Sequence, residues 1–388
     1  MFKIQTLNNI SPVGLDRLPR ESYEVASEIS NPDAILLRSY KMHDMEIPEN
    51  VKAIGRAGAG TNNIPVDRMT EAGIPVFNAP GANANAVREL VIAGMLMACR
   101  NLGKAWDFAR GLEGDDAEIT KQTEAGKKNF VGFELPGRTL GVVGLGAIGV
   151  KVANAARALG MNVIGYDPTI TMQSAWQLSS DVEQAISVDD LLSKSDFITF
   201  HVPLIDSTKN MINAERIKIM KDNAIILNFS RYGIIDDEAV VPALDEGKLY
   251  GYVCDFPSNL LKDHPQCITM PHLGASTGEA EENCAMMVAD QVRDYIENGN
   301  ITNSVNFPSI RLSRNGGCRL AVVNSNVPNM LGQISTDLAE AGLNIIDMVN
   351  KSRGDIAMTL LDVDKEPDQK TMDLLLGIDG VLSVRCLG

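Results

Sequence analysis

Residues 139–167, TLGVVGLGAIGVKVANAARALGMNVIGYD, decide the fold of this chain. An apolar run ends at Val143 and leads into the glycine-rich turn 144–149. A helical pattern follows, and a second apolar run closes on Asp167. This order predicts a strand, a glycine turn, a helix and a second strand, as in units that bind a dinucleotide. The spacing of apolar residues predicts that the helix face formed by Ile148, Val152, Ala155 and Leu159 lies on the sheet.

The three glycines of the turn have separate expected roles. Gly144 would permit a tight turn, Gly146 would let the backbone approach a pyrophosphate, and Gly149 would let the helix pack closely on the strand. Phosphates would meet free N–H groups and the positive dipole at the start of the helix. Asp167 stands roughly 20 residues beyond the turn, where a carboxylate binds a ribose 2′-hydroxyl and repels a 2′-phosphate. The pattern predicts an NAD site; the alternative is an ordinary crossover with incidental glycines.

Size and composition narrow the class of protein. The 388 residues exceed one ordinary core, so two or three domains are expected. With 35 basic and 50 acidic residues the net charge is −15, which disfavours nucleic-acid or membrane partners. No apolar run approaches the ~20 residues of a membrane span, and the first residues, MFKIQTLNNI, lack a signal-peptide pattern. We therefore expect a cytoplasmic protein.

The six cysteines are scattered, without a CxxC pair or a cysteine–histidine spacing suited to a metal. Most lie in apolar runs, so the sequence predicts buried free thiols in a reducing compartment and no metal site. These residues are Cys99, Cys254, Cys267, Cys284, Cys318 and Cys386.

Apolar runs on both sides of the glycine turn predict two layers of parallel strands. The earlier runs are 3–7, 34–38, 52–56 and 75–77, and the later runs are 197–202, 224–229, 251–256 and 267–270. Residues 84–102 form an apolar helical pattern, and the acidic segment 111–124 is expected to be an exposed loop. A capping-box pattern that starts at Ser276 predicts a helix to about Glu297, which Gly299 can end.

From about residue 318 the pattern becomes strand, helix, strand, strand, helix, strand. This βαββαβ order predicts a small ferredoxin-like module, linked through the polar segment 313–317. Its expected elements are 320–323, 330–341, 344–349, 357–363, 369–376 and 381–386. The predicted fold class is α/β, with two doubly wound domains, Rossmann-like and flavodoxin-like, and this module at the C-terminal end.

Ligands of open α/β sheets gather beyond the carboxyl ends of the strands, where 201–203, 228–231, 255–257 and 271–275 are expected. His272 follows a strand and precedes a capped helix, and a histidine can exchange a proton near neutral pH. Arg231 follows a strand directly, where a guanidinium can clamp a carboxylate. The alternatives are a structural histidine and a surface ion pair. For His43, His201 and His264 the structural role is favoured.

Four motifs in this order resemble those of the D-isomer-specific 2-hydroxyacid dehydrogenase family, most closely its phosphoglycerate dehydrogenases. They are GRAGAGTNNI (55–64), VGLGAIG (143–149), NFSRYGIIDDEAV (228–240) and PHLGAST (271–277). The resemblance covers nearly the whole chain. It implies a substrate-binding domain of residues 1–92 and 276–312, an inserted NAD-binding domain of residues 93–275, and NAD-dependent oxidation of D-3-phosphoglycerate to 3-phosphohydroxypyruvate, which opens L-serine biosynthesis.

The resemblance makes Arg231 the carboxylate anchor and His272 the acid/base. With the strand ends, it predicts that the NAD site is lined by Gly144, Gly146, Ala147, Ile148, Gly149, Asp167, His201, Val202, Pro203, Phe229, Ser230, Arg231, Asp255, His272, Leu273, Gly274 and Ala275. Positions that match the substrate site are Arg38, Ser39, Ala57, Gly58 and Asn83. Candidates for the substrate phosphate are Arg38, Lys127 and Lys128.

One departure from the family pattern concerns a glutamate that usually pairs with the catalytic histidine. Here the run Asp255-Phe-Pro-Ser-Asn259 is one residue shorter, and Asn259 stands nearest the expected position. A carboxylate beside a histidine stabilises its charged form. Without it, we expect His272 to stay protonated over a lower pH range. Asp263 or a glutamate of the following helix could replace the missing acid.

Residues 318–388 are similar to an ACT domain, a small amino-acid-sensing unit. The matching segments are NSNVPNMLG (324–332) and GLNI (342–345). The resemblance implies a homodimer or homotetramer that binds L-serine at a subunit interface through Asn324, Asn326 and Asn344. The alternative is a module that serves only dimer packing.

Two rival functions remain open at this stage. One keeps the chemistry on another substrate, as in a glyoxylate/hydroxypyruvate or D-lactate type of dehydrogenase; the ACT-like module argues against it. The other is a non-catalytic NAD-binding regulator, which the missing glutamate favours and the presence of both Arg231 and His272 disfavours.

Overall fold

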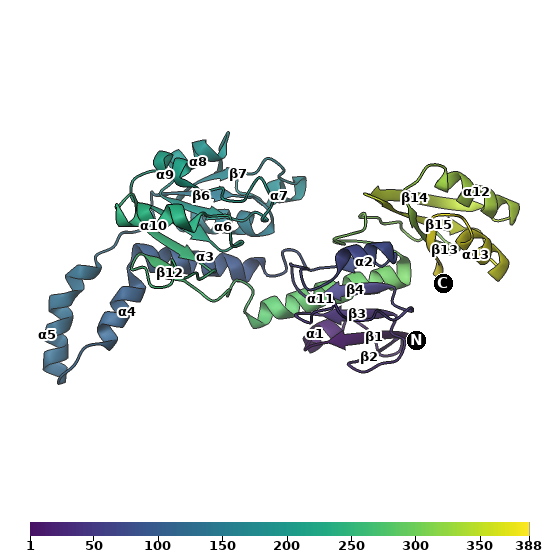
Figure 1. Ribbon diagram of the computed structural model, residues 1–388, viewed down its shortest axis with the longest axis horizontal. Coiled ribbons are helices and arrows are strands. Elements are labelled where there is room, and N and C mark those ends of the chain that lie inside the picture. Colours follow the sequence, from purple (N-terminus) through teal and green to yellow (C-terminus); the bar gives the residue numbers. More distant parts are fainter. Residues whose placement is uncertain (388) are drawn as a thin grey trace. The chain divides into compact units, whose positions relative to one another are not determined.

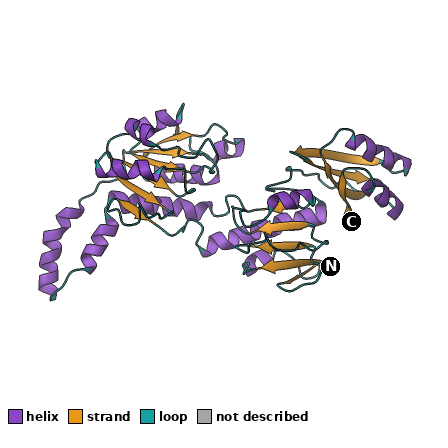
Figure 2. Cartoon of the chain, viewed as in Figure 1, coloured by secondary structure: helices purple, strands orange, loops and turns teal. Residues whose placement is uncertain are grey.

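The computed structural model describes residues 1–387 of the chain (Figures 1 and 2). Its contacts divide the chain into two compact units, Asn83–Ala280 and the combination of Met1–Ala82 with Glu281–Gly388. Each unit is built on a parallel sheet, and the second also carries an antiparallel sheet. The predicted α/β fold class is confirmed.

The unit Asn83–Ala280 contains a seven-stranded parallel sheet in the order β12-β11-β10-β9-β6-β7-β8. Its strands are β6 (Thr139–Val143), β7 (Asn162–Tyr166), β8 (Glu183–Gln184), β9 (Phe197–Phe200), β10 (Ala224–Asn228), β11 (Leu249–Cys254) and β12 (Cys267–Thr269). The chain reverses its direction of winding between the adjacent strands β6 and β9. A crevice beyond the carboxyl ends of these two strands is where such sheets bind ligands.

Helices cover both sides of this sheet, and a hairpin of helices projects from it (Figure 1). The helices are α3 (Ala84–Cys99), α4 (Leu102–Arg110), α5 (Asp116–Gly126), η1 (Lys127–Phe130), α6 (Ala147–Ala158), α7 (Met172–Gln177), α8 (Val188–Lys194), α9 (Ala214–Ile219) and α10 (Asp237–Asp245). The projecting arm, α4 with α5, corrects the predicted loop 111–124. Reciprocal capping starts α5: Asp115 accepts the N–H of Glu118 at 2.9 Å, and Glu118 accepts the N–H of Asp115 at 3.2 Å. As predicted, most residues of the segment 111–124 are exposed.

The helix α6 buries a face rotated from the predicted one. Its buried residues are Gly149, Val150, Val152, Ala153 and Ala156. Of the predicted face only Val152 is fully buried, Ile148 and Ala155 are partly buried, and Leu159 is 40% exposed. The buried face therefore combines the small residues Gly149, Ala153 and Ala156 with the two valines, Val150 and Val152.

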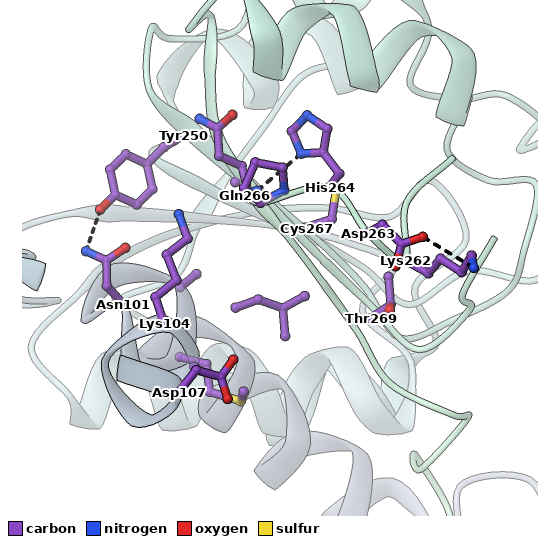
Figure 3. Close-up of a pocket in the computed structure, with 16 residues that line it drawn as sticks. Asn101, Lys104, Asp107, Tyr250, Lys262, Asp263, His264, Gln266, Cys267 and Thr269 are labelled. Carbon is purple, nitrogen blue, oxygen red and sulfur yellow. Dashed lines mark hydrogen bonds and ion pairs between the residues drawn. The ribbon is translucent and has the colours of Figure 1, made fainter. Parts of the chain in front are cut away.

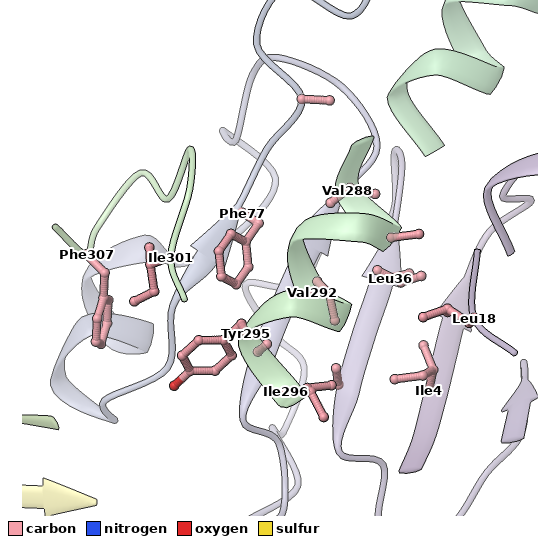
Figure 4. Close-up of a cluster of buried hydrophobic side chains, with 14 of the residues drawn as sticks. Ile4, Leu18, Leu36, Phe77, Val288, Val292, Tyr295, Ile296, Ile301 and Phe307 are labelled. Atoms are coloured by element: carbon pink, nitrogen blue, oxygen red, sulfur yellow. The ribbon is translucent and has the colours of Figure 1, made fainter. Parts of the chain in front are cut away.

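The other parallel sheet has the order β2-β1-β3-β4-β5 of a flavodoxin-like domain. Its strands are β1 (Phe2–Leu7), β2 (Tyr23–Ala26), β3 (Ala34–Leu37), β4 (Ala53–Arg56) and β5 (Val76–Phe77), with helices α1 (Pro12–Leu15), α2 (Val66–Glu71) and α11 (Gly278–Asn298). Sequence reasoning missed the short edge strand β2. The apolar residues of α11, among them Val288, Val292 and Ile296, pack on Ile4 and Leu36 of the sheet (Figure 4).

The start of α11 differs by one residue from the prediction. Thr277, rather than Ser276, caps the helix, because its hydroxyl accepts the N–H of Ala280 at 3.1 Å. The far end is as expected: the last residue is Asn298, and Gly299 follows with φ of 73°.

The C-terminal module has the predicted βαββαβ order and an antiparallel sheet, β14-β15-β13-β16. Its elements are β13 (Cys318–Ser325), α12 (Met330–Glu340), β14 (Ile345–Arg353), β15 (Ile356–Val363), α13 (Gln369–Leu376) and β16 (Val381–Leu387). Arg319, fully buried, anchors this module to the preceding chain. Its guanidinium contacts both carboxylate oxygens of Asp362 at 2.7 and 2.8 Å and donates to the carbonyls of Leu312 and Ser313 at 2.6 and 2.9 Å.

The cysteines agree with the prediction only in part. All six are free, and Cys99, Cys254 and Cys284 are buried. The other three, Cys267, Cys318 and Cys386, are only partly buried. Among residues 1–387, no helix combines the length and apolarity needed to cross a membrane.

Candidate active site

The glycine turn adopts the geometry that its sequence predicts. Gly144 has φ of 91°, a conformation that L side chains rarely adopt. A Cβ on Gly149 would lie 1.9 Å from the carbonyl oxygen of Gly144, so only glycine lets α6 approach the turn. A Cβ on Gly146 would meet open space instead. Gly146 is also the N-cap of α6, where no side chain caps the helix, which leaves N–H groups for an anionic ligand.

Asp167 closes this turn from the end of β7. One carboxylate oxygen accepts the N–H of Leu145 at 2.8 Å, and the other accepts the N–H of Thr169 at 2.8 Å. The carboxylate therefore stands beside the glycine turn, where the predicted ribose contact needs it. Glycine turn, open helix start and carboxylate together fit the dinucleotide for which the motif is typical.

Two alanine substitutions in this turn should have different effects. Gly149→Ala forces α6 away from the turn and should cost about 1–3 kcal/mol of folding free energy, as overpacking does. Gly146→Ala leaves the fold intact but places a methyl group where the pyrophosphate should lie, so the Kd for NADH should rise about tenfold or more, a change of at least 1.4 kcal/mol. Thermal unfolding and NADH fluorescence titration distinguish the two. Unchanged NADH affinity in Gly146→Ala would contradict the predicted pyrophosphate contact.

The segment 201–203 lies against the glycine turn, because a Cβ on Gly144 would come within 2.5 Å of the carbonyl oxygen of His201. The His201 ring is buried, with Nε2 3.1 Å from the hydroxyl of Thr199. Burial disfavours the charged imidazole and lowers the pKa of His201 to about 3. Since His201 stays neutral near pH 7, it is not a proton donor there.

Arg231 is presented by the turn that follows β10. Ser230 donates its hydroxyl proton to the carbonyl of Phe200 at 2.5 Å, which ties this turn to β9. Asn228 donates to the carbonyl of Arg231 at 3.0 Å, and the Arg231 guanidinium donates to the carbonyl of Ser230 at 2.7 Å. The side chain is exposed beyond the sheet edge, whereas the neighbouring ring of Phe229 is buried in the core.

His272 is held in place by its backbone. Asp255, buried at the end of β11, accepts the N–H groups of Leu273 and Gly274 at 2.8 Å each, and its carbonyl accepts the N–H of His272 at 3.1 Å. His272 has φ of 58°, an uncommon conformation for a residue other than glycine, and such conformations cluster at functional sites. Its ring lies 5.2 Å from that of Phe256, centroid to centroid. Asp255 therefore aims the exposed imidazole without binding it.

Arg231 and His272 follow strands at the same edge of one sheet. The strands β10 and β12 flank β11, so their backbones lie about 10 Å apart at the usual strand spacing. Both side chains are exposed at this carboxyl edge. The site therefore offers one cation and one imidazole within reach of a small molecule.

The position of the usual glutamate contains no acid. Asn259 lies in a shallow depression with Tyr232, Ser258 and Lys262. Within residues 83–280, the His272 imidazole contacts the Phe256 ring but makes no ion pair or side-chain hydrogen bond. Asp263, one predicted substitute, pairs with Lys262 at 3.3 Å. In this unit no acid replaces the missing one.

A cavity of about 500 Å³ lies elsewhere in the same unit, against β11, β12, α3 and α4 (Figure 3). Lys104, Asp107, Tyr250 and Asp263 are among its lining residues. His264 also lines it and lies 3.3 Å from Asp245. None of the predicted cofactor residues lines this cavity, so it is separate from the site at the carboxyl edge of the sheet.

In the other unit, two arginines follow adjacent strands, Arg38 after β3 and Arg56 at the end of β4. Arg56 donates to the carbonyl of Arg38 at 3.1 Å, and Arg38 pairs with Glu281 at 2.7 Å. A Cβ on Gly58 would lie 1.9 Å from the Arg56 guanidinium, so Gly58 makes room for it. Sequence reasoning assigned Ala57 and Gly58 to the site but missed Arg56, although it ends a strand just as Arg38 follows one.

The remaining predicted residues have more varied positions. Ser39 is exposed after β3, and Ala57 is buried. Asn83 is the N-cap of α3 and belongs to the unit that contains the glycine turn. Lys127 forms an ion pair with Glu124 on the projecting arm, in the unit that holds the glycine turn.

Comparison with known proteins identifies the family. Residues 92–274 match the model of the "D-isomer specific 2-hydroxyacid dehydrogenase, NAD binding domain". A D-3-phosphoglycerate dehydrogenase of Methanocaldococcus jannaschii is 37% identical over 88% of this chain and 64% of the relative. One of Haemophilus influenzae is 33% identical over 88% of this chain and 83% of the relative.

A solved structure of NAD⁺-bound 3-phosphoglycerate dehydrogenase of Entamoeba histolytica matches with a TM-score of 0.61 and 27% identity, over 79% of this chain and 98% of the other. The chain spans less than two thirds of several curated relatives, 64%, 57% and 54% of three of them. The identity to the Haemophilus protein extends over most of both chains. The chain therefore belongs to the D-isomer specific 2-hydroxyacid dehydrogenase family, and its cofactor is NAD.

Proposed function

We propose that this protein oxidises D-3-phosphoglycerate to 3-phosphohydroxypyruvate with NAD, the first step of L-serine biosynthesis in the cytoplasm. The observation that carries the proposal is the pair Arg231 and His272 at the carboxyl edge of the NAD-binding sheet. Several relatives of 33–37% identity carry the name D-3-phosphoglycerate dehydrogenase. We assign residues 1–92 and 276–312 to substrate binding, 93–275 to NAD and 318–388 to an ACT-like regulatory domain.

The proposed mechanism uses one group for position and one for proton transfer. Arg231 holds the substrate carboxylate by a bidentate contact, which aligns the carbon that reacts. His272 takes the hydroxyl proton on its imidazole during oxidation and returns it in the reverse direction. NAD, when bound, supplies the hydride acceptor. Asp255 keeps the imidazole oriented through the backbone contacts described above.

Arg38 and Arg56 support a phosphorylated substrate. Two guanidinium groups at the ends of adjacent strands suit a phosphate dianion, since each presents a planar fork of donors. We therefore assign the phosphate to Arg38 and Arg56. Lys127 and Lys128 are the weaker candidates, because a lysine ammonium lacks the planar fork of donors that a guanidinium presents to a phosphate.

NADH absorbance with a panel of substrates tests this proposal. D-3-phosphoglycerate should give the highest kcat/KM, and D-glycerate, which lacks the phosphate, should be poor. Equal rates with D-glycerate or D-lactate would favour the alternative, a dehydrogenase of another 2-hydroxy acid. NADH binding without turnover on any member of the panel would favour a non-catalytic regulator.

Introducing the missing carboxylate should change the pH profile. In Asn259→Glu, a carboxylate near His272 would stabilise the protonated imidazole, so the base form needed for oxidation appears only at higher pH. The pH at half-maximal kcat should rise by about one unit. In the control Asn259→Gln the new side chain has the length of glutamate but no charge, so the pH profile should match that of the wild type. Coincident profiles for all three proteins would show that position 259 does not tune His272.

We further propose that two copies of the chain assemble as a homodimer or within a homotetramer. The arm supports this, because α4 has no buried residue and Trp106 is 62% exposed. Exposed large apolar residues on a projecting arm mark a surface that a partner covers. Val131, which follows η1 just after the arm, is 76% exposed.

L-serine is the proposed effector, bound between two copies. Asn324 is buried, and its Oδ1 has no hydrogen-bond partner among residues 1–387. Asn326 lies at the same end of the sheet, where its side chain donates to Gly354 at 3.0 Å. Asn344 lies beside Asp364 at the other end of the sheet. Asn324 pairs with Ala357 in the strand register. At the usual rise of a strand, Ala357 and Asp364 are about 23 Å apart, and so are the two asparagines. One serine can contact both ends only across a subunit interface.

Serine inhibition should therefore need both ends of the sheet. Asn324→Ala and Asn344→Ala should each abolish inhibition of the full-length protein by millimolar L-serine, whereas Thr336→Ala, an exposed position on α12, should not. Initial rates and light scattering check this. Wild-type activity unchanged by serine, or a monomeric protein that is still inhibited, would contradict the proposal.

A further inference from the structure

Two cysteines lie side by side at one end of the ACT-like module. Cys318 begins β13, and Cys386 is near the end of the adjacent strand β16. Cys386 pairs with Leu320 in the strand register, so Cys318 is two residues away on the same face. Their Sγ atoms are 2.6 Å apart, only about 0.6 Å longer than a disulfide bond. Both residues are only partly buried, so a small reagent can reach them.

This end of the sheet is also where the module is anchored to α11. Arg319, next to Cys318, donates to the carbonyl of Leu312, and Arg314 donates to the carbonyls of Glu297 and Leu387 at 2.9 and 3.0 Å. A bond between the two sulfur atoms would join the first and last strands of the module beside these contacts.

We propose that Cys318 and Cys386 are a site of reversible oxidation, at which a low-molecular-weight disulfide such as glutathione disulfide forms a bond between them. One protein thiolate attacks a sulfur of the oxidant, releases one glutathione and leaves a mixed disulfide. The second thiolate attacks the protein sulfur of that mixed disulfide and releases the second glutathione. Two protein thiols become one disulfide, and the oxidant is reduced to two thiols that take up both protons.

The neighbourhood of the pair predicts how the reaction depends on pH. Burial, the hydrogen bond between the Cys318 and Cys386 thiols and the charge of Glu366 raise the pKa of Cys318 to about 12, against the opposing charge of Arg314. The thiolate is the attacking form, so the rate of disulfide formation should increase with pH.

Peptide mapping of the full-length protein tests this site. Reduced protein is incubated with glutathione disulfide, its remaining thiols are alkylated, and trypsin digestion is followed by mass spectrometry. Before alkylation, the intact mass should be about 2 Da below that of the reduced protein, because two hydrogen atoms are lost. The peptide of residues 315–319 should be joined to the peptide that begins at Cys386, and dithiothreitol should separate them.

Single variants provide the controls. Cys318→Ala and Cys386→Ala should lose the linked peptide and keep the other thiol alkylatable or bound to glutathione. Cys267→Ala removes another partly buried thiol and should behave like the wild type. The proposal is overturned if both cysteines stay alkylatable at oxidant equilibrium, if each carries its own glutathione, or if two thiols are still lost in Cys318→Ala.

Discussion

Replacing His272 with glutamine is expected to lower kcat by about 10²–10⁴-fold, the usual contribution of a positioned acid/base. Glutamine keeps a polar side chain of similar reach but cannot take up the hydroxyl proton. The backbone of His272 is held by Asp255, so the substitution should leave the local fold and NADH affinity intact. Steady-state NADH formation and NADH fluorescence titration measure the two effects separately.

His264→Gln is the matched control for this variant. His264 lies 3.3 Å from Asp245 and lines the separate cavity of Figure 3, so its loss should change kcat little. A kcat for His272→Gln within a few-fold of the wild type would remove His272 from the chemistry. Equal losses in the two variants would indicate a general effect of losing a histidine.

Replacing Arg231 with glutamine should lower kcat/KM by about 10²–10³-fold. Each hydrogen bond to a charged group contributes about 1.5–3 kcal/mol, and a bidentate contact to the substrate carboxylate loses two of them. At 1.36 kcal/mol per factor of ten, even a partial loss reaches this range. Arg231→Lys keeps the charge but not the planar fork of donors, so its kcat/KM should lie between those of the wild type and Arg231→Gln.

Arg216→Gln is a suitable control, because Arg216 pairs with Asp189 on the surface of the same unit and should matter little. The kinetic constants for D-3-phosphoglycerate are measured for each variant. If Arg231→Gln retained wild-type kcat/KM, Arg231 would not bind the carboxylate, and another group would have to bind it.

The sequence predicted the NAD-binding sheet well because its signals are local. Gly144 and Gly149 are required by a few neighbouring atoms, because a Cβ on either would lie too close to a backbone carbonyl. The order of elements in the βαββαβ module was also predicted correctly, because the alternation of strand and helix patterns in its sequence is strong. The strand ends that carry Arg231 and His272 follow directly from that alternation.

Other features depend on contacts that a single sequence does not display. The buried face of α6 includes a glycine and two alanines, which a count of large apolar residues overlooks, and the predicted face was therefore rotated. The polar helix α5 has no apolar stripe to reveal it, although the capping pair Asp115 and Glu118 was visible. Arg56 becomes a site candidate only when β3 and β4 are paired. The distance between Asn324 and Asn344 requires the strand register.

A crystal structure of the protein with NADH and 3-phosphohydroxypyruvate tests whether Arg231 and His272 flank the reacting carbon. The His272 imidazole should lie about 3 Å from the ketone oxygen, within hydrogen-bond reach, while Arg231 contacts the carboxylate on both of its oxygens. Either side chain located far from the nicotinamide and the substrate would contradict this arrangement.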